Sequence, residues 1–262
     1  MVNVFSSNYP NYIEQKMQKT IIRVENLTAQ FDEKVVLDDV SLSVYENEIM
    51  VILGSSGCGK TTLLKNIIRL YEPAAGQIEL FGQNINQMEE RDFNQILKKI
   101  GVLFQNGALL NSLKVSENIA IPLQLHTNLS DPVVWRVVQQ KLHLVELENA
   151  FHLFPAQLSG GMRKRAALAR AIVMDPLILF GDEPTAGLDP VTAAALDDLI
   201  LKLKHFLKMT IVIVTHELAS IHRIADRVTF LDKGKVLFVG TLDAAKSAGV
   251  PQIDNFFQHG QF

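Results

Sequence analysis

The sequence has a single cysteine, no long apolar run and no surplus of basic residues, and each absence excludes a class of protein. One cysteine, Cys58, cannot form an intramolecular disulfide framework and is typical of a reducing compartment. The longest apolar runs, such as TIVIVT, fall short of the about 18 residues of a membrane span, so a role at a membrane would come through a partner. A formal net charge of −3 argues against nucleic acid as a main partner.

What the sequence does have is a regular alternation of strand-length apolar runs and helical segments. The stretches IIRVENLTAQF, VVLDDV and SLSVYE predict strands from Thr20 onward. The runs IMVIL and PLILFGDE are typical of strands buried on both faces of a sheet, and residues 60–70 have helical spacing. Asp189 and Pro190 are expected to open a further helix. This alternation predicts an α/β fold with a largely parallel sheet.

Residues 106–157 differ in character from the segments on either side. They contain VSENIAIPLQL and SDPVVWRVVQQKLHLVEL, and in the second stretch Ser130 or Asp131 can cap a helix with Pro132 in its first turn. This pattern predicts a helical insert. The expected division is a polar tail without a signal peptide over 1–19, a core over 20–105 and 158–248, the insert over 106–157 and a C-terminal tail over 249–262.

The stretch GSSGCGKTT, residues 54–62, fits the pattern G-x-x-x-x-G-K-[ST] between a predicted strand and a predicted helix. Small residues let backbone amides wrap phosphate oxygens, and the helix N-terminus adds a partial positive charge. Lys60 can reach the β- and γ-phosphates of ATP, Thr61 can bind Mg²⁺ and Thr62 can reach the α-phosphate. An ordinary glycine-rich turn is the alternative, which this context disfavours. The predicted nucleotide-binding residues are Gly54, Ser55, Ser56, Gly57, Cys58, Gly59, Lys60, Thr61 and Thr62, with the Cys58 side chain as a small filler.

Polar residues follow several of the predicted strands. Asp182 and Glu183 end an apolar strand, where Asp182 can hold Mg²⁺ and Glu183 can orient and polarise an attacking water. Taken alone, they could equally be solvated acids at a strand end. Gln105 and His216 follow two other strands, and ligands of open α/β sheets bind beyond the carboxyl ends of the strands. We therefore expect the side chains of Gln105 and His216 to approach the γ-phosphate.

The stretch LSGGMRKR, residues 158–165, places two glycines where a helix begins. Ser159 can cap that helix, and Gly160 and Gly161 leave backbone amides open to an anion. A second phosphate cradle in one chain requires a phosphate from elsewhere. The alternative is a flexible loop before a basic helix.

The ordered set of motifs, from the phosphate loop through FQ, LSGG, DEP and GLD to TH, resembles the nucleotide-binding domain of ABC transporters. The resemblance implies a RecA-like core, an antiparallel β subdomain and a helical subdomain over 106–157. It also implies a head-to-tail dimer in which Ser159, Gly160 and Gly161 contact the γ-phosphate of the ATP bound by the other copy.

The same resemblance assigns expected roles to single residues. Phe31 matches the aromatic residue that stacks on adenine, although tyrosine is commoner there, and Asp189 matches the aspartate at the dimer interface. Gln105 matches the residue that contacts Mg²⁺ and the membrane subunit, and His216 matches the switch histidine. The expected catalytic residues are Lys60, Gln105, Glu183 and His216, and the expected Mg²⁺ ligands are Thr61, Gln105 and Asp182.

Met162 departs from the family pattern, which usually has glutamine after the second glycine. Methionine cannot make the hydrogen bonds of that amide, so a polar contact from position 162 to the nucleotide is not expected. SGGM, together with LFQNGALL and the AALARA helix, resembles the ATPases of Mla-type, MCE-associated lipid transport systems, known also for organic-solvent resistance. That branch implies a phospholipid or related lipid as the transported substrate.

The implied partners are an integral membrane permease, an MCE-type lipid-binding protein and a small STAS-like accessory subunit, with the ATPase peripheral at the cytoplasmic face of the inner membrane. Another substrate, such as an amino acid, and a complex that transmits a mechanical signal remain alternatives. Near the C-terminus, Phe256 and Phe257 either form a short helix packed on their own domain or dock on the second copy.

Overall fold

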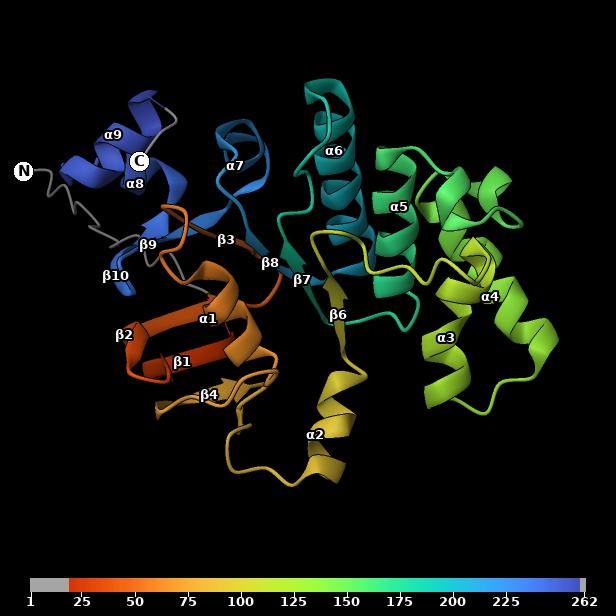
Figure 1. Cartoon of the computed structure of the whole chain (residues 1–262), viewed down its shortest axis with the longest axis horizontal. Helices are drawn as coiled ribbons and strands as arrows, with labels where there is room; N and C mark the ends of the chain where they lie inside the picture. The colour runs from red at the N-terminus through yellow and green to blue at the C-terminus, as the bar shows by residue number, and fades with distance from the viewer. Residues whose placement is uncertain (1–18, 260–262) are drawn as a thin grey trace, which may run out of the picture.

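The computed structural model describes residues 19–259, so the predicted tail over 1–19 lies almost entirely outside the described residues. Two sheets form the centre of the molecule (Figure 1), and within the described range no helix is both long and apolar enough to cross a membrane. The larger sheet is parallel except for one edge strand. In spatial order its strands are β10 (Lys235–Thr241), β9 (Arg227–Asp232), β3 (Ile49–Gly54), β8 (Thr210–Val214), β7 (Ile178–Asp182) and β6 (Ile100–Leu103).

The central strands are buried on both faces because their residues are apolar at nearly every position. In β3, the side chains of Ile49, Val51 and Leu53 join one hydrophobic cluster, and those of Met50 and Ile52 join another. Successive side chains of a strand point to opposite faces, so the two clusters lie on the two sides of the sheet.

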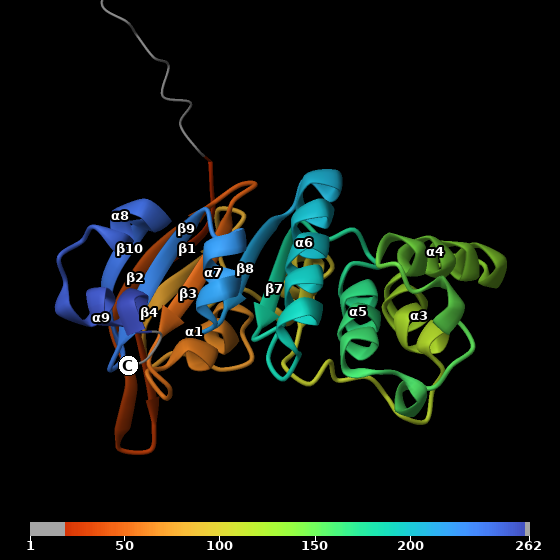
Figure 2. The same cartoon turned by 90° about the horizontal axis from the view of Figure 1, so that it is seen from above.

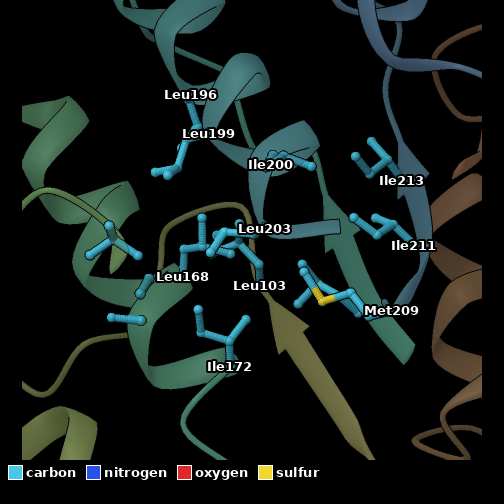
Figure 3. Close-up of a cluster of buried hydrophobic side chains, with 14 of the residues drawn as sticks. Leu103, Leu168, Ile172, Leu196, Leu199, Ile200, Leu203, Met209, Ile211 and Ile213 are labelled. Atoms are coloured by element: carbon cyan, nitrogen blue, oxygen red, sulfur yellow. The ribbon is translucent and has the colours of Figure 1, made fainter. Parts of the chain in front are cut away.

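Helices cover both faces of this sheet. One face packs against α1 (Lys60–Ile67), and the other packs against α5 (Gly160–Ala171), α6 (Pro190–Leu207) and α7 (Leu218–Ile224). Figure 3 shows the second face, where Leu168 of α5, Ile200 of α6 and Ile211 of β8 meet. The predicted start of α6 is confirmed, since the Asp189 carboxylate caps it by accepting hydrogen bonds from the amides of Val191 and Thr192.

The smaller sheet is antiparallel and packs beside α1 (Figures 1 and 2). Its strands, in spatial order, are β2 (Lys34–Tyr45), β1 (Thr20–Phe31), β4 (Ala75–Leu80) and β5 (Gln83–Asn84). The prediction of two separate strands over VVLDDV and SLSVYE is wrong, because β2 continues through both. Asp39 adopts a left-handed conformation with φ of 55° and accepts a hydrogen bond from Asn26 at 2.7 Å. The strand therefore continues through Asp39 with an irregular pairing to β1, where the sequence predicted a break.

Residues 106–157 contain helices, as predicted from their composition. They form α3 (Val115–His126), α4 (Asp131–Leu144) and the short 3-10 helices η1 (Glu148–Ala150) and η2 (Pro155–Gln157). These elements gather beside α5, at the end of the molecule away from β10 (Figure 2). Ser130 is the N-cap residue of α4 and Pro132 lies in its first turn. The helix α2 (Glu90–Leu97), which buries Phe93 and Ile96, was not predicted. The exact domain boundaries stay a prediction.

The C-terminal segment packs on its own chain. After α8 (Leu242–Lys246), α9 (Pro251–His259) buries Ile253 and Phe256 completely. The ring of Phe256 lies 5.8 Å from that of Phe230 in an edge-to-face arrangement, and Phe230 belongs to β9. This packing favours the first of the two interpretations of the C-terminus.

Replacing Phe256 by Ala should therefore destabilise the fold. Removing a fully buried aromatic side chain costs about 3–5 kcal/mol through lost burial and the cavity that remains. The matched control is Phe206→Ala on α6, whose side chain is 71% exposed and should cost less than about 0.5 kcal/mol. Urea denaturation followed by circular dichroism measures both, and equal losses would show that α9 adds little to the stability of the fold.

Candidate active site

The phosphate loop connects the end of β3 to the start of α1 through backbone shapes that favour glycine. Gly54 has a φ of 154°, and a Cβ atom there would lie 1.9 Å from the carbonyl oxygen of Leu231. Gly59 has a φ of 109°, and its Cβ would lie 2.6 Å from the side chain of Leu37. Both glycines are required by close packing as well as by conformation.

A cavity of about 370 Å³ lies where this loop meets the carboxyl ends of β7 and β8. It contains a lysine and two threonine hydroxyls on one side and a carboxylate and an imidazole on the other. The lining residues are Val36, Ser56, Gly57, Gly59, Lys60, Thr61, Thr62, Glu183 and His216. Three separate predicted motifs, the phosphate loop, DEP and TH, therefore meet in one cavity. Val36 belongs to β2, and no sequence signal singled it out.

Two side chains of the loop point away from solvent. The ammonium of Lys60 donates hydrogen bonds to the carbonyls of Gly54 and Ser55, each at 2.9 Å. The thiol of Cys58 is buried in the hydrophobic cluster around α1, and burial raises the pKa of this thiol. Cys58 therefore can contact a phosphate only through its backbone, and its side chain fills space in the core.

Asp182 contacts the phosphate loop through Thr61, whose hydroxyl donates to the carboxylate at 3.2 Å. Burial raises the pKa of Asp182, and the Thr61 hydrogen bond and the nearby Lys65 and Lys60 oppose that rise. Hydroxyl and carboxylate oxygens are the ligand types that Mg²⁺ takes, completed by water and substrate phosphates. No group of three or more His, Cys, Asp or Glu side chains in the described chain could hold a metal alone. The pair therefore fits a Mg²⁺ that arrives with a nucleotide.

Glu183 and His216 form a hydrogen-bonded pair in the lining of the cavity. The Nδ1 atom of His216 lies 2.8 Å from Oε1 of Glu183, and the imidazole is the more exposed of the two side chains. Glu183 has a φ of 47°, a left-handed conformation that is unfavourable for a residue with a Cβ atom. Its amide donates to the carbonyl of Val214 at 2.8 Å, which fixes the turn after β7 against the end of β8.

Several predicted site residues do not line the cavity, namely Phe31, Gly54, Ser55, Cys58, Gln105, Asp182 and Asp189. Phe31 ends β1 at the hairpin, 41% exposed, and packs edge-to-face against Tyr71 with ring centroids 5.1 Å apart. Gln105 follows β6, and its carbonyl accepts a hydrogen bond from Lys164 at 2.5 Å. Phe31 and Gln105 would contact a nucleotide only if the bound nucleotide extended beyond this cavity.

Ser159, Gly160 and Gly161 also lie outside the cavity, at the start of α5. The Ser159 hydroxyl accepts from the amide of Met162 at 3.3 Å, so the predicted cap is confirmed. Gly161 also has a packing role that the sequence pattern did not reveal. A Cβ on Gly161 would lie 2.6 Å from the side chain of Thr192 in α6, and one on Gly160 would lie 3.4 Å from Leu188.

Met162 and Lys164, which follow these glycines, turn inward. Met162 packs against the hydrophobic cluster between α5 and α6, which agrees with its lack of hydrogen-bonding groups. Lys164 is buried, and this burial lowers the pKa of its ammonium. The basic residues 163–165 at the start of α5 are therefore not all solvated.

A glycine-rich phosphate loop that shares a cavity with Glu183 and is hydrogen-bonded to Asp182, both at the end of a buried parallel strand, defines a P-loop nucleotide-binding protein. Comparison with known proteins narrows this class. Residues 37–186 match the family model described as ABC transporter, so the chain belongs to the ABC transporter family and is an ATP-binding ABC transporter ATPase.

Relatives named for different transported substrates are similar to this chain to nearly the same degree. The intermembrane phospholipid transport system ATP-binding protein MlaF of Haemophilus influenzae is 39% identical over 225 residues, which cover 86% of this chain and 85% of that protein. The methionine import ATP-binding protein MetN of Lactobacillus johnsonii is 40% identical over 226 residues, covering 84% and 64%. The probable ribonucleotide transport ATP-binding protein mkl of Mycobacterium leprae is 37% identical over 235 residues, covering 90% and 68%.

Solved structures confirm the predicted fold. A dimeric, post-hydrolysis ATP-binding cassette bound to ADP and Pi superposes with a TM-score of 0.77 at 30% identity, over 84% of this chain and 98% of that chain. The cbiO1 protein of Clostridium perfringens, part of the ABC transporter complex cbiONQ, superposes with a TM-score of 0.80 at 25% identity, over 92% and 96%. The parallel core, the antiparallel β sheet and the helices are those of an ABC ATPase.

Asp197 of α6 is a buried carboxylate that lies near Ser220 and Arg223 of α7. One of its oxygens has no hydrogen-bond partner among the described residues, and the other lies 4.0 Å from the guanidinium of Arg223. Burial raises the pKa of Asp197 to about 6, against the opposing effects of the Ser220 hydroxyl and Arg223 and with a further rise from Glu217. Asp197 therefore destabilises the fold when it is ionised.

Replacing Asp197 by Asn should stabilise the fold increasingly as the pH rises. A carboxyl group with a pKa of about 6 when folded and 3.8 when unfolded binds more protons in the folded state. The free energy of unfolding of the natural chain therefore falls as the pH rises from 3.8 to about 6. The amide that replaces the carboxyl group cannot ionise, so the difference in unfolding free energy between variant and natural chain should grow by about 1–3 kcal/mol from about pH 4 to about pH 7. Urea denaturation across this range measures it. An equal pH-dependent gain in Asp198→Asn would contradict burial as the cause.

Proposed function

We propose that this ABC ATPase acts as a pair of identical copies that bind ATP between them and power the movement of a phospholipid or related lipid through a membrane permease. The observation that carries the ATP part is the cavity in which the phosphate loop, Glu183 and His216 meet. The lipid part is supported by the likeness to the phospholipid transport ATPase, of which this chain covers 85%, and by the SGGM stretch.

A second copy would complete the site. In this chain, Ser159, Gly160 and Gly161 lie outside the phosphate-loop cavity, at the N-terminus of α5. A helix N-terminus binds anions through its free amides and its dipole. The dimeric cassettes among the solved structures support a pair of copies. In a head-to-tail pair, each ATP would lie between one phosphate loop and the other copy's signature residues, with Asp189 near the interface.

Within the site, each side chain has a role that follows from its position. Lys60 would leave the carbonyls of Gly54 and Ser55 to bind the β- and γ-phosphates, and Thr62 lies two residues further along the same cradle. Thr61 and Asp182, with Gln105, would hold Mg²⁺, which supplies charge neutralisation of the phosphates when bound.

Hydrolysis requires a water aligned with the γ-phosphate, and Glu183 is placed to accept a hydrogen bond from it. His216 lies 2.8 Å from Glu183 and lines the same cavity, so it would hold the Glu183 carboxylate and donate toward the γ-phosphate. Phe31, beside Tyr71, would stack on the adenine.

The membrane partners follow from the same proposal. A permease would contact the helical segment over 106–157, which begins directly after Gln105 and connects the nucleotide site to α3 and α4. ATP-driven closure would then shift the population of permease conformations. The ATPase would lie at the cytoplasmic face of the inner membrane, with an MCE-type lipid-binding protein and a small STAS-like subunit in the complete assembly. A methionine or ribonucleotide transporter, or a mechanical signalling complex, is the alternative.

Replacing Glu183 by Gln should stop hydrolysis and preserve ATP binding, because glutamine keeps the shape of the side chain but cannot act as a base. Loss of a general base lowers kcat by about 10²–10⁴-fold. Phosphate release measures the turnover, and equilibrium binding of a fluorescent ATP analogue measures the affinity. Glu148→Gln, an exposed carboxylate in the helical segment, is the control that should leave both unchanged. Robust turnover by the Glu183 variant would falsify the assigned role.

The transported substrate can be tested on the intact complex. We expect phospholipids to co-purify with the complex in larger amounts than with the same complex carrying Glu183→Gln and trapped with ATP, because closure changes access to the substrate path. Mass spectrometry of extracted lipids, calibrated against an unrelated permease in the same detergent, measures this difference. Stimulation of the ATPase by methionine or a nucleoside, with no lipid enrichment, would contradict the lipid proposal.

A further inference from the structure

Lys164 connects two parts of the site that are far apart in the sequence. Its side chain is only 7% exposed, and its ammonium donates to the carbonyl of Gln105 at 2.5 Å and to the carbonyl of Glu183 at 3.3 Å. These carbonyls follow β6 and β7, which are neighbours in the parallel sheet. One ammonium therefore bridges the ends of two strands.

The bridge needs a positive charge. Burying an ammonium is unfavourable unless hydrogen bonds and opposite charges compensate for lost water. Here the two carbonyls supply the hydrogen bonds, and the carboxylates of Glu217, Glu183 and Asp182 attract the ammonium. An apolar side chain of similar length would fill the space and provide neither interaction.

Lys164 donates to the carbonyl of Glu183, a residue with a strained backbone conformation. Glu183 holds a φ of 47°, and such a conformation persists only where its surroundings impose it. Its amide is fixed by Val214, and its carbonyl accepts from the amide of Ala186 at 3.2 Å as well as from Lys164. The direction of the Glu183 carboxylate depends on this backbone conformation, so Lys164 contributes to aiming it.

At the other end, α5 holds the segment that follows β6. The guanidinium of Arg170 donates to the carbonyl of Gly107 at 2.8 Å and to that of Ala108 at 2.7 Å. Gly107 lies so close to α5 that an added Cβ would be 3.2 Å from the Cβ of Ala167. Residues 105–108 are thus bound to α5 by Lys164 in its first half and by Arg170 near its end. Lys164 also connects them to the carbonyl of Glu183.

We propose that Lys164 is a positioning residue of the ATPase, which holds the backbone of Glu183 in its hydrolytic orientation and makes that orientation depend on the seating of the Gln105 segment. The inference rests on the proposed role of Glu183 in activating water. It gives the helical segment a direct route to the hydrolytic step, because the chain enters that segment through residues 105–108.

The test compares Lys164→Met, which removes the charge, with Lys164→Arg, which retains it. The natural chain and both variants are assayed as full-length protein for kcat, KM for ATP and thermal unfolding. We expect Lys164→Met to lower kcat about 10–100-fold with KM unchanged, since a displacement of about 1 Å at a catalytic group costs that much. Lys164→Arg, which keeps the positive charge, should retain a large part of the natural kcat. Natural turnover in Lys164→Met, or no rescue by arginine, would overturn the proposal.

Lys141→Met is the matched control. Lys141 is as buried as Lys164 and pairs with Asp175, but it lies in α4, outside the site. Its replacement should lower the unfolding temperature and leave kcat unchanged. An equal loss of kcat in Lys141→Met would show that Lys164 acts only through stability. If Lys164→Met does not fold, Lys164→Gln keeps a polar side chain of nearly the same reach and takes its place.

A double variant separates this proposal from the proposed function. If Lys164 acts through Glu183, then Lys164→Met should cause no further loss in a chain that already carries Glu183→Gln, as measured by single-turnover hydrolysis. Full additivity would overturn the positioning role while leaving the role of Glu183 intact. Rapid turnover by Glu183→Gln alone would instead remove the proposed function on which the inference rests.

Discussion

The parallel pairing of β3, β8 and β7 is the constraint on which the site depends. Every residue of these three strands is buried, and the registers place Ile52 beside Val214 and Val214 beside Asp182. A slip of one residue would exchange the two faces of a strand and its two hydrophobic clusters. The phosphate loop, the Asp-Glu pair and His216 all lie where these strands end. The geometry of the site is therefore fixed by the packing of the core.

The features that could be predicted from the sequence are those encoded within a few neighbouring residues. The glycine pattern of the phosphate loop, the Ser159 and Asp189 caps and the buried strands are local or periodic signals. The continuous β2 was missed because Asp39 resembles a turn residue, and only its partner Asn26 shows that the strand continues. The role of Lys164 could not be predicted, since its acceptors are 59 and 19 residues away in the sequence and become neighbours only through the sheet.

The glycines of the LSGGM stretch share one constraint, and Gly161 has a second. Their pattern predicts contact with a phosphate held by another copy, and the structure adds that Gly161 has no room for a Cβ beside Thr192. Close approach of α5 and α6 brings Asp189, the N-cap residue of α6, near the start of α5. A substitution at Gly161 would thus disturb packing within the chain as well as any contact with a partner, so a loss of activity alone cannot separate the two roles.

The charge at the start of α5 is consistent with a helix that binds an anion. Its first turn has no acidic residue, and Arg163, Lys164 and Arg165 follow within the next turn. Positive charges near a helix N-terminus are unfavourable because they add to the positive end of the dipole. Lys164 escapes this repulsion by turning inward to the carbonyls of Gln105 and Glu183. A phosphate near the N-terminus of α5 would lower the remaining positive potential there. The same helix would then gain stability from the nucleotide of a second copy, while its Lys164 donates to the backbone carbonyl of Glu183 in its own chain.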